Sequence, residues 1–492
     1  MNPEKSKKFY ITTAIPYVND VPHVGHALEF VQADVLARVA AARGEDVRVL
    51  SGADENALKN VQAAEKAGVP VREFIEANAK LFALLAERLN AHFDVFQRGS
   101  DTEHHYPASQ ELWRRCAGAG DIYKKSYEGL YCLGCEAFYT AEELTPDGQC
   151  HEHPGKKLEM VSEENYFFRL SKYQDQIIAL ISSDTIRIIP VSRKNEVLGF
   201  LRQSLEDISI SRSNERARNW GVPVPGDDTQ RMYVWFDALN IYQSGIGFGW
   251  DDAQYQKWWP ADAHLIGKGI LRFHAVYWPA FLLSAKLPLP KSIIVHGYIT
   301  VDGQKMSKTV GNVIDPFALI EKYGVDPVRY YLLREIPSGE DGDFSYEKFE
   351  QRYNGDLANG IGNLVARVAA LGESVSPIPV HTDDKIEKEI MRVRDVCERH
   401  IAEFRLNEAL AIMWDLVSFA DKYINNTKPW TMKDDPVALQ KIIANAAALV
   451  DAARQLLTPF LPDTTEKIEG QIRVSDGRIT IKKGGNLFPR LN

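Results

Sequence analysis

Along the first hundred residues, apolar and polar positions follow a pattern typical of strands that alternate with helices. Residues 8–15 (KFYITTAI) have the continuous apolar character of a buried strand, and residues 26–44 have apolar positions at helical spacing and end in a glycine. A second strand is predicted at 46–54, and helical spacing returns over 57–89. Because strands that alternate with helices form parallel sheets with right-handed crossovers, this region predicts half of a Rossmann-like α/β domain.

The alternation stops near residue 117 and resumes near residue 226. The segment between is rich in cysteine, glycine and aromatic residues, which indicates an insertion. Strands are predicted again at 263–267 and 292–301, with a helix at 270–285 between them, and beyond residue 346 the pattern is almost wholly helical. We therefore predict four segments: 1–116 and 226–345 as the halves of a split α/β domain, 117–225 as an insertion, and 346–492 as a helical bundle.

The composition is typical of a soluble, well-packed protein and excludes nucleic-acid binding by overall charge. The chain has 492 residues, 45% of them hydrophobic and 25% charged, and a net charge of −9. It shows no apolar leader and no apolar run of the ~18 residues that a membrane helix needs, so we expect a cytoplasmic protein without a membrane partner. An RNA contact would need local basic surface. The candidates, each equally typical of a solvated face, are Arg212, Arg216 and Arg218, the pair Lys305 and Lys308, and the tail 478–485.

Three of the five cysteines fall within nineteen residues and suggest a metal site. Cys132, Cys135, Cys150 and His153 form the pattern C-x₂-C-x₁₄-C-x₂-H, in which two short ligand pairs are separated by a loop. Three thiolates and one imidazole suit a closed tetrahedral site for structural Zn²⁺. His151 is an alternative fourth ligand, and reduced cysteines without a metal are the alternative to the site itself.

The stretch AIPYVNDVPHVGHALEF (14–30) places His23, Gly25 and His26 where a strand passes into a helix. A helix N-terminus after a parallel strand offers unpaired N–H groups and a positive dipole end, both of which favour an anion. The histidines add donors for phosphate oxygens, and Gly25 lets a flat base or sugar approach the backbone. The turn therefore suggests a nucleotide triphosphate site, although two unrelated surface histidines would give the same short pattern.

A second candidate phosphate-binding segment is the loop DGQKMSKTVGN (302–312). Lys305 and Lys308 are three residues apart in this glycine-containing loop, and lysines so placed can neutralise the charge that develops in phosphoryl transfer. Considered by itself, a solvated lysine-rich loop would explain the run equally well. The loop indicates a phosphate-binding site only in combination with the histidine turn.

Together, HVGH and KMSK resemble the two signature motifs of class I aminoacyl-tRNA synthetases, HIGH and KMSKS. Longer segments resemble the methionyl-tRNA synthetase family of that class: AIPYVNDVPHVGH, NEVLGFLRQSLEDISISR, MYVWFDALNIY, RFHAVYWPAFL, HGYITVDGQKMSK and NNTKPW. They are more specific than either tetrapeptide, and the resemblance runs from residue 9 to the final LFPRLN. It implies a catalytic domain split by a zinc-knuckle insertion, a region in 226–345 that contacts the tRNA stem, and an anticodon-binding domain over 346–492.

The resemblance further implies that the chain attaches methionine to tRNA(Met) through methionyl-adenylate, using ATP with Mg²⁺. The positions that match ATP-binding residues are His23, Gly25, His26, Lys268, Lys305 and Lys308, and His23, His26, Lys305 and Lys308 are the implied catalytic groups. The positions that match methionine-binding residues are Ile15, Tyr17, Asp54, Trp235, Tyr242 and His274, with Asp54 receiving the amino group. Asn363, Arg367 and Trp430 match positions that read the anticodon.

The chemistry of these residues suits their implied roles. Methionine has no strong hydrogen-bonding group in its side chain, so a pocket reads its shape and its sulfur, and each sulfur–aromatic contact contributes ~0.3–1.5 kcal/mol. Asn363 and Arg367 are four residues apart and share a helix face, and Trp430, in a loop after Pro429, can stack on an unpaired base. An ordinary helical bundle with a buried tryptophan is the alternative. Because the sequence ends without the appended domain that makes some relatives dimers, we expect a monomer.

Three segments depart from the family pattern. Gly269 stands where the pattern GKDI has an acid that holds the ATP ribose, and Thr309 replaces the last serine of KMSKS. In GADEN, Ala53 and Asn56 stand where GTDEH has a threonine and a histidine. Gly269 favours a degenerate tRNA-binding protein as one alternative; another class I synthetase and an unrelated zinc-containing RNA-binding module are the others. Because both ATP motifs are retained, we predict an active methionine–tRNA ligase.

Overall fold

The computed structural model describes residues 7–132, 137–139, 144–152, 155–156, 158–306, 310–432 and 434–491. The chain forms two compact units. Unit 1 comprises Met1–Pro22, Ala40–Ala86 and His92–His296, and unit 2 comprises His23–Val39, Glu87–Ala91 and Gly297–Asn492. The four segments predicted from the sequence stay predictions, because each unit draws residues from several of them.

A six-stranded parallel sheet forms the centre of unit 1, as the alternating pattern predicts. Its strand order is β3-β2-β1-β12-β13-β7, and β1 (Lys8–Thr12) lies between β2 (Asp46–Ala53) and β12 (Ala263–Gly267). The strand order therefore reverses between β1 and β12. In open α/β sheets, ligands bind at the carboxyl ends of the strands at such a reversal.

The segment predicted as an insertion (117–225) also contributes to the central sheet. β7 (Arg187–Ile189) pairs in parallel with β13 (Ser292–His296) at the edge of that sheet, a pairing that the sequence did not predict. Three residues are too few to show as a periodic run in the sequence. The same segment holds an antiparallel sheet of order β5-β4-β6-β8, in which β4 (Ile122–Cys132) pairs with β6 (Glu159–Phe168).

Further elements complete unit 1. They are α2 (Leu58–Ala67), α3 (Val71–Arg88), β3 (Val95–Arg98), α4 (His105–Gly118), β5 (Ala137–Tyr139), η2 (Leu170–Tyr173), α5 (Gln174–Ser182), α6 (Val191–Phe200), β8 (Ile208–Ser209), β9 (Ser211–Ser213), α7 (Asn214–Ala217), β10 (Pro223–Val224), β11 (Asp227–Met232), α8 (Val234–Ala238), α9 (Ile241–Ser244), α10 (Asp252–Trp258), η3 (Lys268–Ile270), η4 (Phe273–Tyr277) and α11 (Trp278–Ser284).

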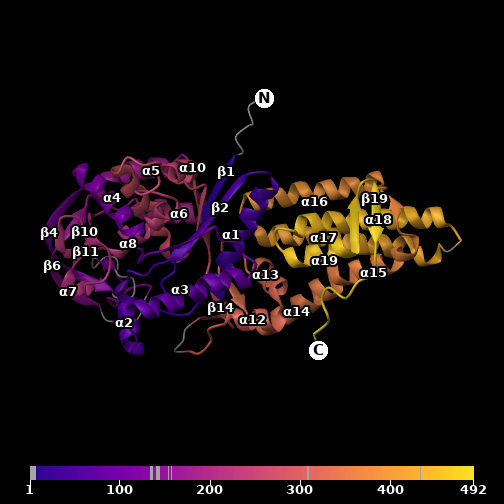
Figure 1. Cartoon of the computed structure of the whole chain (residues 1–492), viewed down its shortest axis with the longest axis horizontal. Coiled ribbons are helices and arrows are strands. Elements are labelled where there is room, and N and C mark those ends of the chain that lie inside the picture. Colours follow the sequence, from indigo (N-terminus) through magenta and orange to yellow (C-terminus); the bar gives the residue numbers. More distant parts are fainter. Residues whose placement is uncertain are drawn as a thin grey trace, which may run out of the picture. The chain divides into compact units, whose positions relative to one another are not determined.

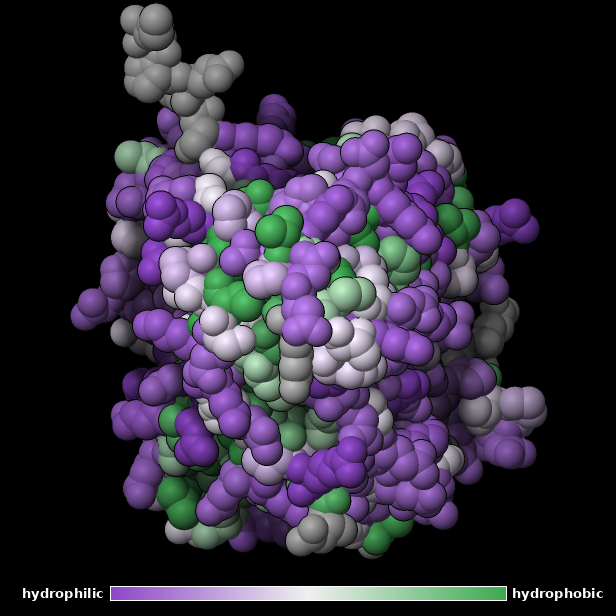
Figure 2. Space-filling model, turned by 90° about the vertical axis from the view of Figure 1, so that its right-hand side faces the viewer, coloured by the Kyte–Doolittle hydropathy of each residue, from purple (hydrophilic) through white to green (hydrophobic). Residues whose placement is uncertain are grey.

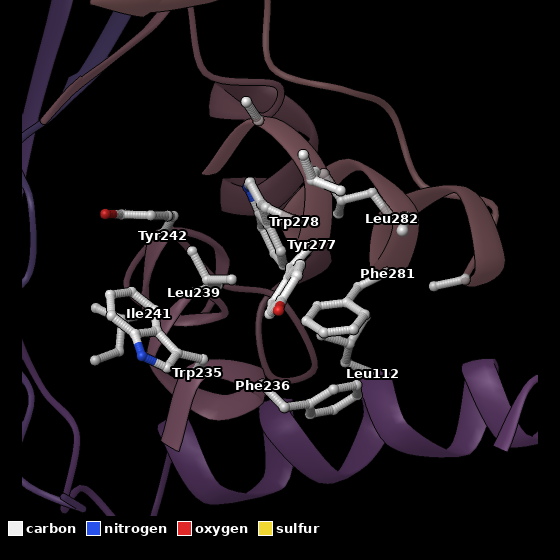
Figure 3. Close-up of a cluster of buried hydrophobic side chains, with 14 of the residues drawn as sticks. Leu112, Trp235, Phe236, Leu239, Ile241, Tyr242, Tyr277, Trp278, Phe281 and Leu282 are labelled. Atoms are coloured by element: carbon white, nitrogen blue, oxygen red, sulfur yellow. The ribbon is translucent and has the colours of Figure 1, made fainter. Parts of the chain in front are cut away.

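Aromatic and aliphatic side chains of unit 1 pack into a buried cluster (Figure 3). The rings of Phe236 and Phe281, from α8 and α11, lie 4.7 Å apart between centroids. Such aromatic pairs stabilise the fold beyond the burial of their apolar area. Trp235 and Tyr242 lie at one edge of the cluster in Figure 3, and the phenol oxygen of Tyr242 points away from Trp278.

Unit 2 is mainly helical, as the pattern after residue 346 predicts. α16 (Asp384–Ala402), α17 (Leu406–Thr427) and α18 (Pro436–Leu457) lie side by side, joined by short connections (Figure 1). α18 begins with a proline at its first turn, and the Asp435 carboxylate before it accepts a hydrogen bond from the Ala438 N–H over 3.0 Å. Both features are typical of a helix N-terminus.

The other elements of unit 2 belong to shorter helices and two small sheets. They are α1 (Val24–Ala42), of which unit 2 contains the first part, β14 (Ile299–Val301), β15 (Gln304–Lys305), α12 (Pro316–Tyr323), α13 (Val325–Arg334), β16 (Gly342–Phe344), α14 (Tyr346–Arg352), η5 (Tyr353–Gly362), α15 (Asn363–Gly372), η6 (Glu373–Val375), β17 (Ile378–Pro379), η7 (Pro429–Thr431), α19 (Pro462–Gln471), β18 (Ile472–Ser475) and β19 (Arg478–Ile481).

One helix of unit 2 reaches the length and mean hydropathy of a membrane helix, although it contains no continuous apolar run of ~18 residues. Among the described residues, α18 alone passes a test of length and composition, with a mean hydropathy of 1.2 in its best window. The alanines of α18 raise its hydropathy without a continuous run of large apolar residues. Of that window, 56% is buried inside the structure, as in the core helix of a bundle.

Candidate active site

The loop after β2 holds Asp54 beside Tyr17. The two residues form an isolated parallel bridge, and the Asn60 side chain donates to the Asp54 carbonyl oxygen over 2.9 Å. Asp54 is 2% exposed. Gly52 admits no side chain, because a Cβ there would lie 2.2 Å from the Gln97 carbonyl oxygen. The end of β2 therefore packs closely against its neighbour strand and fixes the start of this loop.

Aromatic rings continue from Tyr17 to Tyr242. The ring centroids of Tyr17 and Trp235 are 6.4 Å apart in an edge-to-face arrangement, and those of Trp235 and His274 are also 6.4 Å apart. The Tyr242 hydroxyl lies 2.7 Å from Nε2 of His274. Trp235 is also stacked on Phe273, with centroids 3.8 Å apart. These contacts gather residues that lie far apart in the sequence.

The hydrogen bonds of His274 fix its protonation. Its Nδ1 lies 2.9 Å from the Ile270 carbonyl oxygen, which can only accept, so Nδ1 carries the hydrogen and Nε2 accepts from Tyr242. Burial lowers the pKa of His274 to about 4. Burial also holds the pKa of neighbouring His264 well below its ordinary value, and His274 adds to this effect. Both imidazoles are therefore neutral at neutral pH.

All six residues predicted to bind methionine lie in unit 1. Four of them are buried, namely Asp54, Trp235, Tyr242 and His274. Ile15 and Tyr17 are partly buried and pack against the same hydrophobic cluster. The structure thus combines aromatic rings, neutral imidazoles and one carboxylate, which suits an amino acid with an apolar side chain and a positively charged amino group.

The histidine turn of unit 2 presents two oriented rings. Nδ1 of His23 accepts from the Gly25 N–H, and Nδ1 of His26 accepts from the His23 N–H, both over 3.1 Å. In the neutral form of each ring, Nε2 therefore bears the hydrogen. The rings stack with centroids 4.0 Å apart, and a Cβ on Gly25 would lie 2.9 Å from Cε1 of His23. The glycine is thus required for this arrangement, in which even uncharged rings keep an N–H donor.

The predicted lysines lie on different elements. Lys305 is exposed at the end of β15, which follows β14 through a tight turn at Asp302 and Gly303 with φ of 50° and 74°. Lys308 lies outside the described residues. Lys268 begins η3 directly after β12, at the carboxyl end of a central strand, and Gly269 follows it.

The residues predicted to read the anticodon all lie in unit 2. Asn363 and Arg367 lie on α15, and the Arg367 guanidinium donates to the Asp421 carboxylate over 3.0 Å and to Oδ1 of Asn425 over 2.8 Å. Trp430, in η7 after α17, is 47% exposed. Figure 2 views the molecule from the right-hand side of Figure 1 and shows that hydrophobic residues on this face are interspersed with hydrophilic ones.

Half of the predicted zinc ligands belong to the described residues. Cys132, at the end of β4, and Cys150 both have 0% exposure. Cys135 and His153 lie outside the described residues, and the alternative ligand His151 is exposed. Within the described ranges, no group of three or more His, Cys, Asp and Glu side chains could hold a metal ion. The zinc knuckle therefore stays a prediction.

Two residues that pack against the rings of Trp235 and Tyr242 were not predicted from the sequence. Phe273 stacks on Trp235, and His264 lies 4.4 Å from Tyr242 between ring centroids. Nδ1 of His264 lies 2.7 Å from Oγ1 of Thr12 on the adjacent strand. A polar residue inside the buried run of 263–267 was the signal that could have indicated His264.

The arginines considered as local basic surface are engaged within unit 1. Arg212 is 7% exposed, with its guanidinium 4.6 Å from the centroid of the Tyr233 ring. Arg216 forms an ion pair with Glu159 at 3.7 Å, and Arg218 forms one with Glu65. Arg212 and Arg216 are therefore largely engaged within unit 1, whereas the Arg218 side chain is 44% exposed.

Two family descriptions match the chain in succession. "tRNA synthetases class I (M)" matches residues 9–369, and "Anticodon-binding domain of tRNA ligase" matches residues 383–482. The chain is 42% identical to the methionine–tRNA ligase of Brucella suis biovar 1, over 94% of this chain and 91% of that protein. It is also 42% identical to that of Thermotoga maritima, over 94% of this chain and 74% of the relative.

Solved structures of similar proteins agree with these matches. The methionyl-tRNA synthetase of Mycobacterium tuberculosis bound by methionyl-adenylate has a TM-score of 0.93 and 37% identity, over 98% of this chain and 100% of that one. Its free form has a TM-score of 0.85 and 35% identity, with full coverage of both chains at 100%. The matches exclude an unrelated RNA-binding module and a different amino acid specificity. The chain therefore belongs to the methionyl-tRNA synthetases of class I, the enzymes that join methionine to its tRNA.

Proposed function

We propose how residues of this chain carry out the two steps of this family's reaction. In the first step the methionine carboxylate attacks the α-phosphorus of ATP, which forms methionyl-adenylate and releases pyrophosphate. In the second, the 2′-hydroxyl of the terminal tRNA ribose attacks the methionyl carbonyl carbon and AMP leaves. Neither step forms a bond to the protein, so the rate rests on positioning and on electrostatic stabilisation of the phosphate.

The proposed methionine site is the set Ile15, Tyr17, Asp54, Trp235, Tyr242 and His274. The observation that supports it is the unbroken series of contacts from Asp54 through Tyr17 and Trp235 to His274 and Tyr242. The Asp54 carboxylate would pair with the substrate ammonium, and the rings would contact its thioether at ~0.3–1.5 kcal/mol each. The bond between Tyr242 and His274 satisfies both polar groups without a polar substrate atom.

The proposed phosphate-binding groups are His23 and His26, which donate through Nε2, with Lys268, Lys305 and Lys308. Gly25 leaves space for the His23 ring beside the backbone, and Mg²⁺ bound with ATP would supply further neutralisation of the phosphates. The hydrogen bonds at Nδ1 of both histidines support this role, because they leave the hydrogen on Nε2. All five groups would act on charge that develops at phosphorus and on the leaving pyrophosphate.

Pyrophosphate–ATP exchange with purified protein, measured against a panel of amino acids, tests the function. We expect exchange with methionine alone. Such a result would also show that Gly269, in place of the usual acid, permits nucleotide binding. Absence of exchange with every amino acid, from protein that still binds tRNA, would contradict the proposed chemistry.

Lys308→Ala tests the phosphate-binding role. Removing one donor to a developing charge commonly costs ~2.7–4 kcal/mol of barrier, so we expect exchange to slow by about two to three orders of magnitude. Lys322→Ala is the matched control, because Lys322 is an exposed lysine bonded to Glu350 at 3.2 Å. Near-normal exchange in Lys308→Ala, or an equal loss in the control, would contradict the role.

The proposed structural Zn²⁺ is held by Cys132, Cys135, Cys150 and His153, with His151 as the alternative. Buried thiols at Cys132 and Cys150 support this, because a closed zinc site takes deprotonated cysteines away from solvent. When bound, the ion would add folding free energy to this segment. We expect about one zinc per chain by metal analysis, and its loss in Cys132→Ser. Zinc content that Cys132→Ser leaves unchanged would contradict the assignment.

The proposed reader of the tRNA anticodon is the set Asn363, Arg367 and Trp430. Two bonds to α17 hold the Arg367 guanidinium, and an exposed indole can stack on an unpaired base. A monomeric state and a cytoplasmic location also stay proposals. Light scattering of the full chain in solution would test the first.

A further inference from the structure

A buried amide joins the loop that carries Asp54 to the helix that carries Trp235. Nδ2 of Asn56 donates to the Gly99 carbonyl oxygen over 2.7 Å and to the Asp237 carboxylate over 2.8 Å. Asp237 and Trp235 both lie in α8, and Asn56 follows Asp54 by two residues. One side chain thus connects two parts of the proposed methionine site that lie about 180 residues apart in the sequence.

The partners of this amide determine its orientation. The Gly99 carbonyl oxygen can only accept, so it faces Nδ2, and Oδ1 accepts from the Tyr106 hydroxyl over 3.2 Å. Asn56 is 7% exposed. Gly99 also approaches the loop through its N–H, which donates to the Ala53 carbonyl oxygen over 2.9 Å. The amide is therefore satisfied on both sides and held in one position.

Asp237 is also held from α4. Nε2 of His105 lies 3.5 Å from Oδ1 of Asp237, and Nδ1 of His105 lies 2.8 Å from Oγ of Ser244 in α9. Burial raises the pKa of Asp237, and its contacts with His105 and Asn56 oppose that rise. The other ionisable groups around this network are Tyr106, Arg72, Arg231 and Glu55.

We propose that Asn56 is a positioning residue that sets the separation between Asp54 and Trp235. The inference rests on the proposed methionine site. In that site Asp54 binds the substrate ammonium and Trp235 contacts the thioether, so their separation must match the length of methionine. Asn56 acts through its hydrogen bonds to the Asp237 carboxylate and the Gly99 carbonyl oxygen, and other residues contact the reacting atoms.

Asn56→Asp in the full chain tests the proposal through the pH dependence of methionine KM. The variant replaces the donor with a second carboxylate next to Asp237, and two carboxylates so close remain together only while they share a proton. We expect methionine KM to rise at least about tenfold at pH 8 and to recover partly at pH 6, with ATP KM within about twofold of wild type. Asn56→Ala, which adds no charge, is expected to raise methionine KM equally at both pH values.

Asn445→Asp is the matched control in unit 2. Asn445 is a buried residue of α18, and its Nδ2 donates to the Asp383 carboxylate over 2.7 Å. The substitution also places a second carboxylate beside an aspartate, although the Asp383 side chain is 39% exposed and pairs with Lys441 at 3.1 Å. We expect unchanged methionine KM at both pH values. A pH-dependent rise in this control as large as that in Asn56→Asp would overturn the inference, because the effect would then be one of general stability.

Two further variants separate failure of the inference from failure of the site. Asp54→Ala and Trp235→Leu should each raise methionine KM if the proposed methionine site is correct. Unchanged KM in both would overturn the site and the inference together. A rise in both, with unchanged methionine KM in Asn56→Asp and Asn56→Ala, would overturn the positioning role alone. If Asn56→Asp does not fold, Asn56→Ala decides by the same measurement.

Discussion

His274 gives unit 1 a pH dependence whose sign follows from its burial. It is 1% exposed, and burial lowers its pKa to about 4, whereas an unfolded chain has ~6.5. Between these values the unfolded chain binds more protons, so the free energy of unfolding falls as pH drops from about 6.5 towards 4. At ~1.4 kcal/mol per pH unit, the loss from this residue is about 3 kcal/mol. The lowered pKa of His264 acts in the same direction.

His274→Gln removes one of these titrations. We expect the variant to be less stable than wild type at pH 7, because the bond to Tyr242 is disturbed. Its free energy of unfolding should nevertheless change less between pH 7 and pH 5. Urea unfolding followed by tryptophan fluorescence measures both quantities. His92→Gln, at a histidine whose side chain is 75% exposed, is the control and should keep the wild-type pH dependence; an equal slope in all three proteins would contradict the role of His274.

The residues of the proposed site show which features can be predicted from a single sequence and which cannot. Tyr17, Trp235 and His274 could be named because their segments resemble a known family. Their contacts could not be predicted, because the isolated bridge between Tyr17 and Asp54 and the stacking of Trp235 depend on the packing of distant segments. Asn56 shows this most clearly, since only the fold reveals that it donates to Asp237.

At the scale of elements, Arg329 ties α13 to α1 and to the turn before α19, all within unit 2. Its guanidinium pairs with the Asp34 carboxylate at 2.7 Å and donates to the carbonyl oxygens of Phe460, at 2.8 Å, and Leu89, at 3.0 Å. Arg329 is 0% exposed and Asp34 is 2% exposed. A planar guanidinium can bond these partners together, which a lysine ammonium cannot.

Arg329→Met should destabilise unit 2 strongly. The substitution leaves Asp34 with the partly exposed Arg38 as a partner, and it removes a buried donor from the carbonyl oxygens of Phe460 and Leu89. Loss of one partner from a buried ion pair commonly costs ~3–5 kcal/mol. Arg38→Met is the control, because Arg38 also bonds Asp34, at 2.8 Å, but its side chain is 29% exposed. We expect a smaller loss there, and a partial recovery in the double variant Asp34→Leu with Arg329→Met. Urea unfolding of the full chains gives the comparison, and equal losses in the two single variants would contradict it.

The predicted elements agree best with the structure where one periodicity runs unbroken. The strand predicted at 263–267 is β12 at the same bounds. The strand predicted at 292–301 is instead two strands in different sheets. The pairing is interrupted at Gly297, where a Cβ would lie 2.1 Å from the Glu340 backbone. The hairpin of β18 and β19 was missed, although its turn at Asp476 and Gly477 has the positive φ that such a dipeptide favours.

At the scale of the whole molecule, the sequence predicted the order of the α/β and helical segments along the chain, but it did not predict which strands pair. The split of the α/β domain follows from the pattern, whereas the pairing of β1 with β12 and of β13 with β7 is a property of the fold alone. The two reaction steps make different demands on such a chain. Adenylate formation needs only methionine and ATP, and transfer of methionine also needs the tRNA.

Trp430→Ala should separate these steps. Base–aromatic stacking contributes ~1–3 kcal/mol, so we expect kcat/KM for tRNA(Met) in aminoacylation to fall about 5- to 150-fold. Pyrophosphate exchange should stay within about twofold of wild type, since no RNA takes part in it.

Tyr346→Ala is the matched control, because Tyr346 also belongs to unit 2 and both side chains are 47% exposed. If exposure of an aromatic ring were sufficient, the two variants would lose aminoacylation equally. If Trp430 reads the anticodon, only Trp430→Ala loses aminoacylation. Trp430→Ala should then discriminate less well than wild type against a tRNA with an altered anticodon. Equal discrimination by both proteins would show that Trp430 contributes affinity without reading the base.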